Sequence, residues 1–235
     1  MDEMGDLEDR IRTLVQWMAE AKRLVVFTGA GISTDSGLPD FRGPDGVWTR
    51  QEKGLPPRDA KLDWTKTEPN PAHHAIADLQ QMGKLDFLVS QNIDDLHLSS
   101  GIRPELLAEL HGNLARLRCV DCERTYPKSP ELERCDCGGS LKSSVVGFGD
   151  SLPVKDLTES FEHARDCDLL IVIGSSLVVT PAATVPQVAF EAGARLVIIN
   201  QGETPLDAIA QLRFTEAIGE VFPAAVQRLK ETTSQ

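Results

Sequence analysis

Four of the five cysteines lie in one short stretch, as Cys119-x2-Cys122 and Cys135-x-Cys137 with twelve residues between the pairs. Clustered thiolates of this kind are typical ligands of tetrahedral zinc, and the first pair with the glycines after the second is typical of a zinc ribbon. Four thiolates leave no open position for water, so the metal would be structural. The second pair is one residue shorter than Cys-x-x-Cys, and an unmetallated or partly occupied site is the alternative. Cys167 lies before an apolar run and is expected in the core.

A second candidate site is the glycine-rich segment "GAGISTDSG" (29–37), which follows an apolar run. Glycines would let the backbone approach a diphosphate, and backbone amides with the hydroxyls of Ser33 and Thr34 could donate to its oxygens. The hydride-transfer fingerprint would have a third glycine at position 34, so Thr34 disfavours a dehydrogenase. A Gly-x-Gly alone is equally compatible with a tight turn.

Small or polar residues follow each of four apolar runs, at positions 29–31, 91–92, 174–176 and 200–202. In an open parallel sheet, ligands bind outside the carboxyl ends of the strands, where the strand order reverses. The four termini therefore predict one polar, glycine-lined crevice for a nucleotide. The alternative is that these residues only form the turns that strand ends require.

The longer string "GAGISTDSGLPDFRG" (29–43) resembles the cofactor loop of the sirtuins, the NAD-dependent protein deacylases. Four further strings resemble sirtuin motifs in the family's order: "SQNIDDLH" (90–97), "LHGN" (110–113), "GFGD" (147–150) and "GSSLVVTP" (174–181). The resemblance covers about residues 10–230. The strings "FRGPDGVWT", "LAELHGN" and "DSLP" are most similar to the class IV branch of the family.

The resemblance implies an enzyme that consumes NAD and releases nicotinamide, O-acyl-ADP-ribose and free lysine. Among the five histidines, the resemblance selects His111 as the general base. In the family's mechanism the acyl oxygen attacks the nicotinamide ribose as nicotinamide leaves, and the base then deprotonates a ribose hydroxyl. An imidazole with a pKa of ~6.5 suits this role. Asn92 and Asp94 match the residues that hold the ribose and the nicotinamide amide, and complete the expected catalytic set.

Other positions match the family's contacts with NAD or peptide. Phe41 matches the ring that shields the reactive carbon from water. The expected NAD contacts are Gly29, Ala30, Gly31, Ser33, Thr34, Asp40, Phe41, Arg42, Trp48, Gln91, Asn92, Asp94, His111, Gly174, Ser175, Ser176, Asn200, Gln201, Gly202 and Ile218. The expected peptide-binding edges are Val146, Gly147, Phe148 and Gly149 on one side and Leu177, Val178 and Val179 on the other. The acylated peptide would lie between them as an added strand.

The chain departs from the family at Asp95, where glycine is usual. A second carboxylate beside Asp94 would raise a pKa if both were buried, and aspartate only tolerates the positive φ that glycine permits. The favoured interpretation is that Asp95 points to solvent, so that Asp95→Gly changes nicotinamide release by a few-fold at most.

The expected acyl group is uncharged, either acetyl or a longer fatty acyl group. Family members that prefer succinyl- or malonyl-lysine bind its carboxylate with a tyrosine and an arginine. The single tyrosine of this chain, Tyr126, lies in the cysteine module. The segment 44–71 contains Arg50 and Arg58 but no tyrosine.

The elements that must position these residues are strands alternating with helices. Strands are expected at 24–29, 85–91, 168–174 and 195–200, and helices at 7–21, 72–82, 183–192 and 219–230, with a further helical pattern around His163. Near-continuous apolar strands predict an α/β fold, a Rossmann-like parallel sheet with helices on both faces. We expect one catalytic unit over 1–235. Its large lobe would comprise 7–43, 72–112 and 149–232, and its small lobe the zinc module 113–148 with the insertion 44–71.

Composition narrows the function further. The net charge of −12 argues against direct binding of nucleic acid, which requires a basic surface, and favours basic protein partners. The acidic N-terminus lacks the apolar core of a secretory signal, and the longest strongly apolar run, about 169–173, is too short for a membrane span. Clustered thiols predict a cytoplasmic location. A mono-ADP-ribosyltransferase with the same NAD site and a non-enzymatic NAD-sensing module remain alternatives.

Overall fold

The computed structural model describes residues 6–43, 46–56, 64–147 and 149–233. The helices are α1 (Leu7–Glu20), α2 (Val47–Glu52), α3 (Pro71–Gln81), α4 (Leu96–Ser99), α5 (Val154–Asp166), α6 (Thr184–Glu191) and α7 (Ile218–Thr233). Short 3-10 turns are η1 (Ala30–Ser36), η2 (Trp64–Lys66), η3 (Pro104–Leu106) and η4 (Asp207–Ile209). The strands are β1 (Leu24–Thr28), β2 (Leu85–Ser90), β3 (Leu107–Glu109), β4 (Arg116–Cys119), β5 (Thr125–Pro127), β6 (Leu141–Ser143), β7 (Leu169–Ile173), β8 (Arg195–Ile199) and β9 (Leu212–Phe214).

Six parallel strands form the main sheet, in the order β3-β2-β1-β7-β8-β9. The chain starts at β1 in the middle, builds outward to β3, and then returns to β7 on the other side of β1. The strand order therefore reverses between β1 and β7, whose last residues Thr28 and Ile173 pair. This order is that of a doubly wound dinucleotide fold, which binds ligands at this reversal point.

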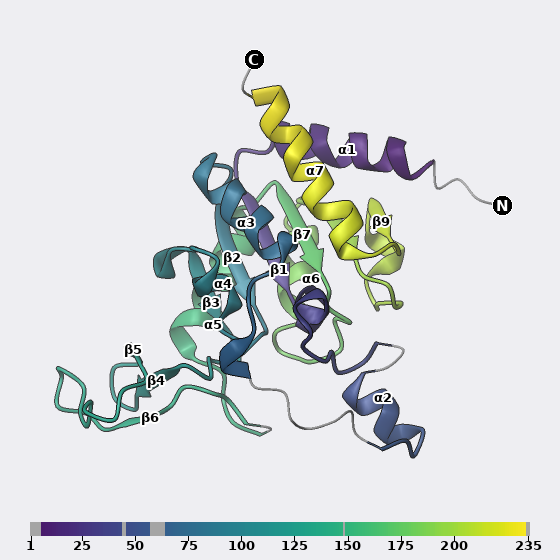
Figure 1. Ribbon diagram of the computed structural model, residues 1–235. Coiled ribbons are helices and arrows are strands. Elements are labelled where there is room, and N and C mark those ends of the chain that lie inside the picture. The colour runs from purple at the N-terminus through teal and green to yellow at the C-terminus, as the bar shows by residue number, and fades with distance from the viewer. Residues whose placement is uncertain (1–5, 44–45, 57–63, 148, 234–235) are drawn as a thin grey trace.

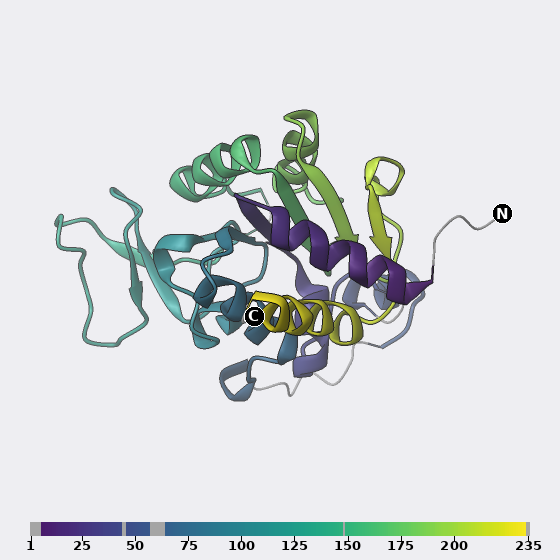
Figure 2. The same ribbon diagram turned by 90° about the horizontal axis from the view of Figure 1, so that it is seen from above.

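Helices cover both faces of the sheet, as Figure 2 shows from above. Alternate residues of each strand point to opposite faces, so Leu24 and Val26 pack in one core cluster and Val25 and Phe27 in the other. The first cluster includes residues of α1, α3 and α7, and the second includes residues of α5 and α6. The central strands are buried on both sides, which accounts for their continuous apolar sequence.

The predicted α/β fold with a parallel sheet is confirmed. Each of the four predicted strands ends within one residue of the observed strand, and the four predicted helices match α1, α3, α6 and α7. The pattern around His163 belongs to α5. The strands β3 and β9 and the short helices α2 and α4 were not predicted.

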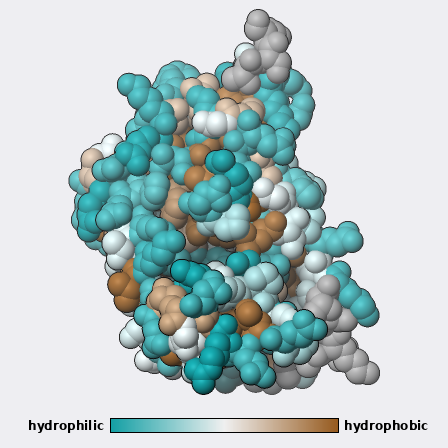
Figure 3. All heavy atoms as spheres, turned by 90° about the vertical axis from the view of Figure 1, so that its left-hand side faces the viewer, coloured by the Kyte–Doolittle hydropathy of each residue, from teal (hydrophilic) through white to brown (hydrophobic). Residues whose placement is uncertain are grey.

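A second, smaller sheet projects from the side of the molecule, below and to the left in Figure 1. Its three antiparallel strands have the order β5-β4-β6. Figure 3 views the molecule from this side: hydrophilic side chains cover most of the face, with small groups of apolar side chains exposed between them. The segment that contains the four clustered cysteines thus forms a small sheet of its own.

None of the described helices combines the length and the apolar character that crossing a bilayer requires.

Candidate active site

A cavity of about 470 Å³ opens at the carboxyl ends of the parallel strands. Its walls come from η1 and the residues after it, from the loop after β2, from the segment before α5, and from the loops after β7 and β8. Its volume lies in the range of cofactor sites. The cavity thus occupies the reversal point between β1 and β7.

All of the predicted NAD contacts line this one cavity, the expected catalytic residues His111, Asn92 and Asp94 among them. They are Gly29, Ala30, Gly31, Ser33, Thr34, Asp40, Phe41, Arg42, Trp48, Gln91, Asn92, Asp94, His111, Gly174, Ser175, Ser176, Asn200, Gln201, Gly202 and Ile218. Residues up to 189 positions apart in the sequence, from 29 to 218, therefore meet in one place.

The predicted peptide edges are only partly brought to the cavity. Val146, Gly147, Gly149 and Val179 line it. Leu177 is buried in the core beside the second helical layer, and Val178 is 45% exposed outside the cavity wall. Phe148 lies outside the described residues.

The cavity also has lining residues that the sequence did not indicate: Asp35, Leu38, Pro39, Gly43, Trp64, Ile93, Val145, Asp150, Leu152, Thr180, Pro181, Glu203 and Ala217. Most are immediate neighbours of predicted residues, so a wider window around each motif would have included them. Trp64 is different, because η2 is distant in sequence from every motif. Only the fold brings its ring to the cavity.

The glycines of the first loop are required by its contact with the loop after β7. Gly31 N donates to Gly174 O over 2.8 Å. A Cβ on Gly31 would lie 2.7 Å from Gly174 Cα, and one on Gly29 would lie 2.7 Å from Gly174 O. Gly174 itself has a φ of +66°. Because no side chain fits between these backbones, the two loops form the floor of the cavity in direct contact.

The imidazole of His111 is held in one orientation by the backbone. Its Nδ1 lies 2.8 Å from the carbonyl oxygen of Gln91. A carbonyl only accepts, so Nδ1 carries the proton and Nε2 is left as an acceptor on the ring that lines the cavity. Burial lowers the pKa of His111 from its ordinary value, and the bond to Gln91 opposes that shift. The ring is therefore a neutral base near pH 7.

The other two expected catalytic residues are linked through one hydroxyl. Ser33 Oγ donates to Asp94 Oδ2 over 2.7 Å, and Asn92 Nδ2 donates to Ser33 Oγ over 3.2 Å. His73 Nε2 lies 3.4 Å from the same oxygen, while its Nδ1 accepts from the backbone of Asn70. Burial lowers the pKa of His73 to about 3. The neutral ring thus completes a network that fixes Asn92 and Asp94.

His97 lies under the cavity rather than in its wall. Its Nε2 is 2.8 Å from Thr28 Oγ1, and its ring is 5.1 Å from that of His73. Burial lowers the pKa of His97 to about 4, so it is neutral as well. Both rings belong to the support of the site.

Two aromatic rings stand at the mouth of the cavity. Phe41 and Trp48 are stacked, with ring centroids 6.1 Å apart and planes inclined by 28°. Trp48 N also donates to Phe41 O. Phe41 is 42% exposed, a large exposed area for an aromatic side chain. The ring is thus available to cover a ligand.

The described lining of the cavity is rich in carboxylates: Asp35, Asp40, Asp94, Asp150 and Glu203. Arg42 is the only lysine or arginine in that lining. A diphosphate bound here would depend on Arg42 and on backbone amides for its neutralisation.

Asp95 does not point to solvent, so the favoured interpretation was wrong. Its backbone has the left-handed conformation that glycine favours, with φ 66° and ψ 4°. Its Oδ1 accepts a hydrogen bond of 2.7 Å from Asn113 Nδ2. The backbone geometry expected for glycine is thus kept, with a carboxylate added that contacts a neighbouring segment.

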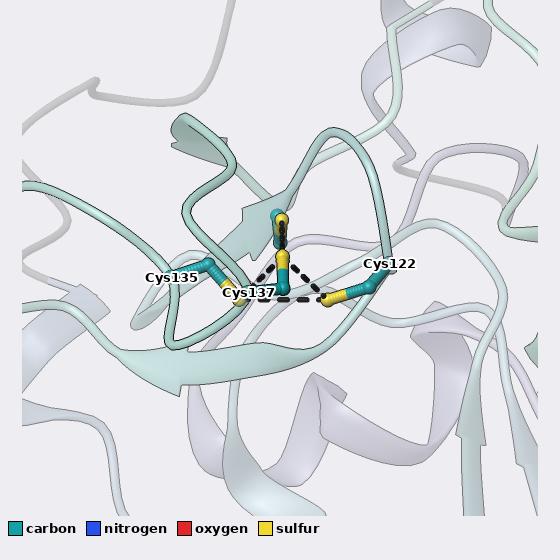
Figure 4. A group of neighbouring side chains, drawn as sticks. Cys122, Cys135 and Cys137 are labelled. Atoms are coloured by element: carbon teal, nitrogen blue, oxygen red, sulfur yellow. Dashed lines mark hydrogen bonds between the residues drawn. The ribbon is translucent and has the colours of Figure 1, made fainter.

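The four predicted zinc ligands form one cluster, in which the sulfurs of Cys119, Cys122, Cys135 and Cys137 all lie within 4.8 Å of one another. The closest pairs, shown by dashed lines in Figure 4, are 3.3–3.5 Å apart. Tetrahedral zinc with Zn–S bonds of ~2.3 Å needs sulfurs ~3.8 Å apart, whereas a disulfide needs ~2.05 Å. The donor set and its spacing therefore fit zinc, and the short Cys135-x-Cys137 turn accommodates both ligands.

Cys167 lies apart from this cluster, as predicted. It is buried in the core, and its Sγ donates to Ala164 O.

Comparisons with known proteins agree with the resemblance. A family model described as "Sir2 family" matches residues 57–181. The "NAD-dependent protein deacylase 2" of Archaeoglobus fulgidus is 41% identical over 97% of this chain and 100% of its own length. The "NAD-dependent protein deacylase" of Pyrococcus furiosus is 39% identical over 91% of this chain and 95% of its own length. The "NAD-dependent protein deacetylase SRT1" of Oryza sativa subsp. indica is 41% identical, but this chain spans only 45% of it.

Solved structures are similar over nearly the whole chain. One described as "Sir2-p53 peptide-NAD+" has a TM-score of 0.74 and 34% identity over 96% of this chain and 99% of its own. Another, of a Sir2 homologue in complex with NAD, has a TM-score of 0.73 and 37% identity, with 94% of each chain covered.

Proposed function

The chain belongs to the Sir2 family, and we propose that it is an NAD-dependent protein-lysine deacylase. It would consume NAD, an acylated lysine and one water molecule, and release nicotinamide, O-acyl-ADP-ribose and free lysine. Relatives named for this activity match over nearly their whole length, and similar structures contain NAD and a peptide.

The observation that carries the proposal is the orientation of His111. Its Nδ1–H is used by Gln91 O, so its Nε2 is free to accept a proton from a ribose hydroxyl of bound NAD. Asn92 and Asp94, fixed through Ser33, would hold the ribose and the nicotinamide amide. Phe41 would cover the reactive carbon against water.

The remaining lining residues would bind NAD rather than react. The cavity floor at Gly29–Gly31 and Gly174–Ser176 and the Arg42 guanidinium would hold the diphosphate. Asn200, Gln201, Gly202 and Ile218, after β8 and at the start of α7, would hold the adenosine half.

We propose that the acyl group is uncharged, acetyl or a longer fatty acyl. Tyr126 hydrogen-bonds within the cysteine module, with its hydroxyl 3.1 Å from Cys135 Sγ, and does not line the cavity. The carboxylates in the cavity wall would also repel an anionic acyl group. A succinyl-peptide turned over faster than the matching acetyl-peptide would contradict this.

The peptide would bind as an added strand between 146–149 and 177–179. Val146 and Val179 supply cavity-lining positions on the two sides. The burial of Leu177 leaves Val178 and Val179 as the accessible side chains of the second edge.

The division into a large lobe (7–43, 72–112 and 149–232) and a small lobe (113–148 with 44–71) is part of the proposal. The separate three-stranded sheet supports it. A class IV assignment and a cytoplasmic location stay predictions.

Mass spectrometry of NAD products with a panel of acyl-lysine peptides tests the function. We expect nicotinamide and O-acyl-ADP-ribose in equal amounts, and His111→Ala should abolish both. His74→Ala is the matched control, because His74 is an exposed histidine of α3. ADP-ribose attached to protein would indicate a transferase, and NAD binding without nicotinamide release would indicate a sensing module.

A further inference from the structure

Asp95 keeps a backbone conformation that is unfavourable for a residue with a side chain. Its φ of 66° is in the left-handed region, where a side chain crowds the backbone of a non-glycine residue. Glycine would remove that crowding. An aspartate here needs a compensating interaction of its side chain.

The Asp95 side chain accepts a long hydrogen bond of 3.5 Å from Ser99 Oγ, but its short one comes from Asn113. All the hydrogen-bonding groups of the buried Asn113 side-chain amide have partners. Its Nδ2 donates to Asp95 Oδ1 over 2.7 Å and to Glu109 Oε1 over 2.6 Å. Its Oδ1 accepts from Ala115 N over 2.8 Å. With both N–H groups and the oxygen paired, the amide has one orientation. Asp95 and Glu109 thus hold the Asn113 amide from two different segments.

Asn113 lies where three segments of the cavity wall meet, and hydrogen bonds to or from the backbone join these segments. Leu114 N donates to Ile93 O over 2.9 Å, beside the Asp95–Asn113 bond. Asn113 N donates to the Ser144 hydroxyl, which in turn donates to Asn113 O. The segments carrying Asn92 and Asp94, His111, and Val146 are therefore joined next to Asn113.

We propose that Asp95 is a positioning residue, which acts through Asn113 to hold the loop 92–95 against the segment 109–114. The bond sets the relative position of Asn92, Asp94 and His111, which themselves contact the substrates. This inference rests on the proposed function, because it assigns those three residues to the deacylation reaction.

Three substitutions separate this role from a purely conformational one. Asp95→Asn keeps an acceptor for Asn113, and asparagine tolerates positive φ. Asp95→Gly relieves the backbone but removes the acceptor. Asp95→Ala removes the acceptor and leaves the backbone strained. If the role of Asp95 is only conformational, the glycine variant should be the most active of the three. If Asp95 is a positioning residue, the asparagine variant should be more active than the glycine and alanine variants.

The experiment measures nicotinamide release with saturating acyl-peptide, together with hydrogen exchange of the Leu114 amide. We expect kcat to fall about ten-fold in Asp95→Gly and Asp95→Ala, and the asparagine variant to stay within about three-fold of wild type. The KM for NAD should change by less than about two-fold, since the bond fixes relative geometry rather than an NAD contact. Leu114 exchange should accelerate in the glycine and alanine variants only.

A glycine variant with wild-type kcat and wild-type Leu114 exchange would overturn the inference. Thermal unfolding of each variant shows whether it is folded, and the exchange measurement needs no activity. If wild type itself releases no nicotinamide, the proposed function fails, while the Leu114 exchange still tests the link between the two segments.

Discussion

At the scale of single residues, the site depends on neutral imidazoles. His73 and His97 are neutral because burial lowers the pKa of each, and they hold their neighbours without adding charge beneath an acidic cavity. His111 differs in having a ring nitrogen free at the cavity. The same residue type thus supports the site in two places, and in the proposed function it acts as the base in a third.

The lowered pKa of His111 predicts the pH dependence of the reaction. A base must be unprotonated, and burial keeps the ring unprotonated to lower pH than usual. We expect kcat/KM for acyl-peptide to rise with pH along an acidic limb centred below pH ~6.5, and to be flat above it. His74→Ala should leave the limb in place. A limb centred above the ordinary histidine pKa would contradict the assignment.

Glu109 predicts a pH dependence of stability. Burial raises its pKa from 4.5 to about 7, helped by Asp95 and Asp156 and opposed by the Asn113 bond and Arg116. Between those two values the native state binds more protons than the unfolded state, so the free energy of unfolding falls as pH rises through that window. Glu109→Gln keeps an acceptor for Asn113 without the charge.

We expect Glu109→Gln to match wild type at pH 4 and to be more stable by about 3 kcal/mol at pH 8. Guanidinium unfolding at both values measures this. Glu105→Gln, an exposed glutamate four residues earlier, is the control and should show no such difference. An equal change at both pH values for Glu109→Gln would refute the pKa argument.

Much of the site could be predicted from sequence, because its residues lie in strings whose order and types resemble one family. The resemblance did not predict that Trp64 lines the cavity, because no motif includes this residue. It also did not predict that Leu177 is buried. The resemblance also led to a wrong expectation for Asp95. The family motif shows only that Asp95 replaces a glycine. The partner of its side chain, Asn113, lies eighteen positions away and comes into contact only in the folded structure.

At the scale of elements, the contact between the loops after β1 and β7 is the critical one. Gly174 and Gly83 have the same φ of +66°, but only Gly174 is packed: a Cβ there would lie 2.4 Å from Ile32 N. A Cβ on Gly83 has nothing within 4 Å. Substituting the two glycines in turn therefore separates the cost of backbone strain, which both share, from the cost of steric overlap, which only Gly174 has.

Gly83→Ala should therefore cost about 1 kcal/mol of unfolding free energy, and Gly174→Ala about 3 kcal/mol. Only Gly174→Ala should also weaken NAD binding, because the two loops would have to separate. Denaturant unfolding and calorimetric titration with NAD measure the two effects. Equal destabilisation by both substitutions would show that the loops are not in close contact.

The elements that sequence predicted are those with strong periodicity. The buried strands β1, β7 and β8 are near-continuous apolar runs, and α1 places Ile11, Leu14 and Met18 on one face. The strands β3 and β9 have three residues each and carry no comparable pattern. These two strands form because their backbones pair with the edges of β2 and β8, and such pairing depends on the tertiary fold rather than on the local sequence.

At the scale of the whole molecule, the small sheet needs the thiol cluster. Its strands have three or four residues, too few for independent stability. Two contacts connect it to the main body at α5. Glu123 accepts from the backbone N–H groups of Val154 and Lys155 at the start of that helix, and Arg118 pairs with Asp156 over 2.8 Å. Loss of the cluster should therefore also disturb the start of α5 in the main body.

Removal of zinc by a strong chelator should unfold the small sheet and lower deacylation by at least about ten-fold, since structural zinc supplies folding free energy directly. The residues before α5, including Val146 and Gly147, should exchange amide hydrogens faster, because Glu123 and Arg118 lose their fixed positions.

Untreated protein should contain about one equivalent of zinc, and added zinc should restore activity. Cys122→Ser should mimic the chelator, whereas Cys167→Ser, outside the cluster, should retain the metal. Protein with far less than one equivalent of zinc and an intact small sheet would show that the four thiols hold the lobe together without a metal.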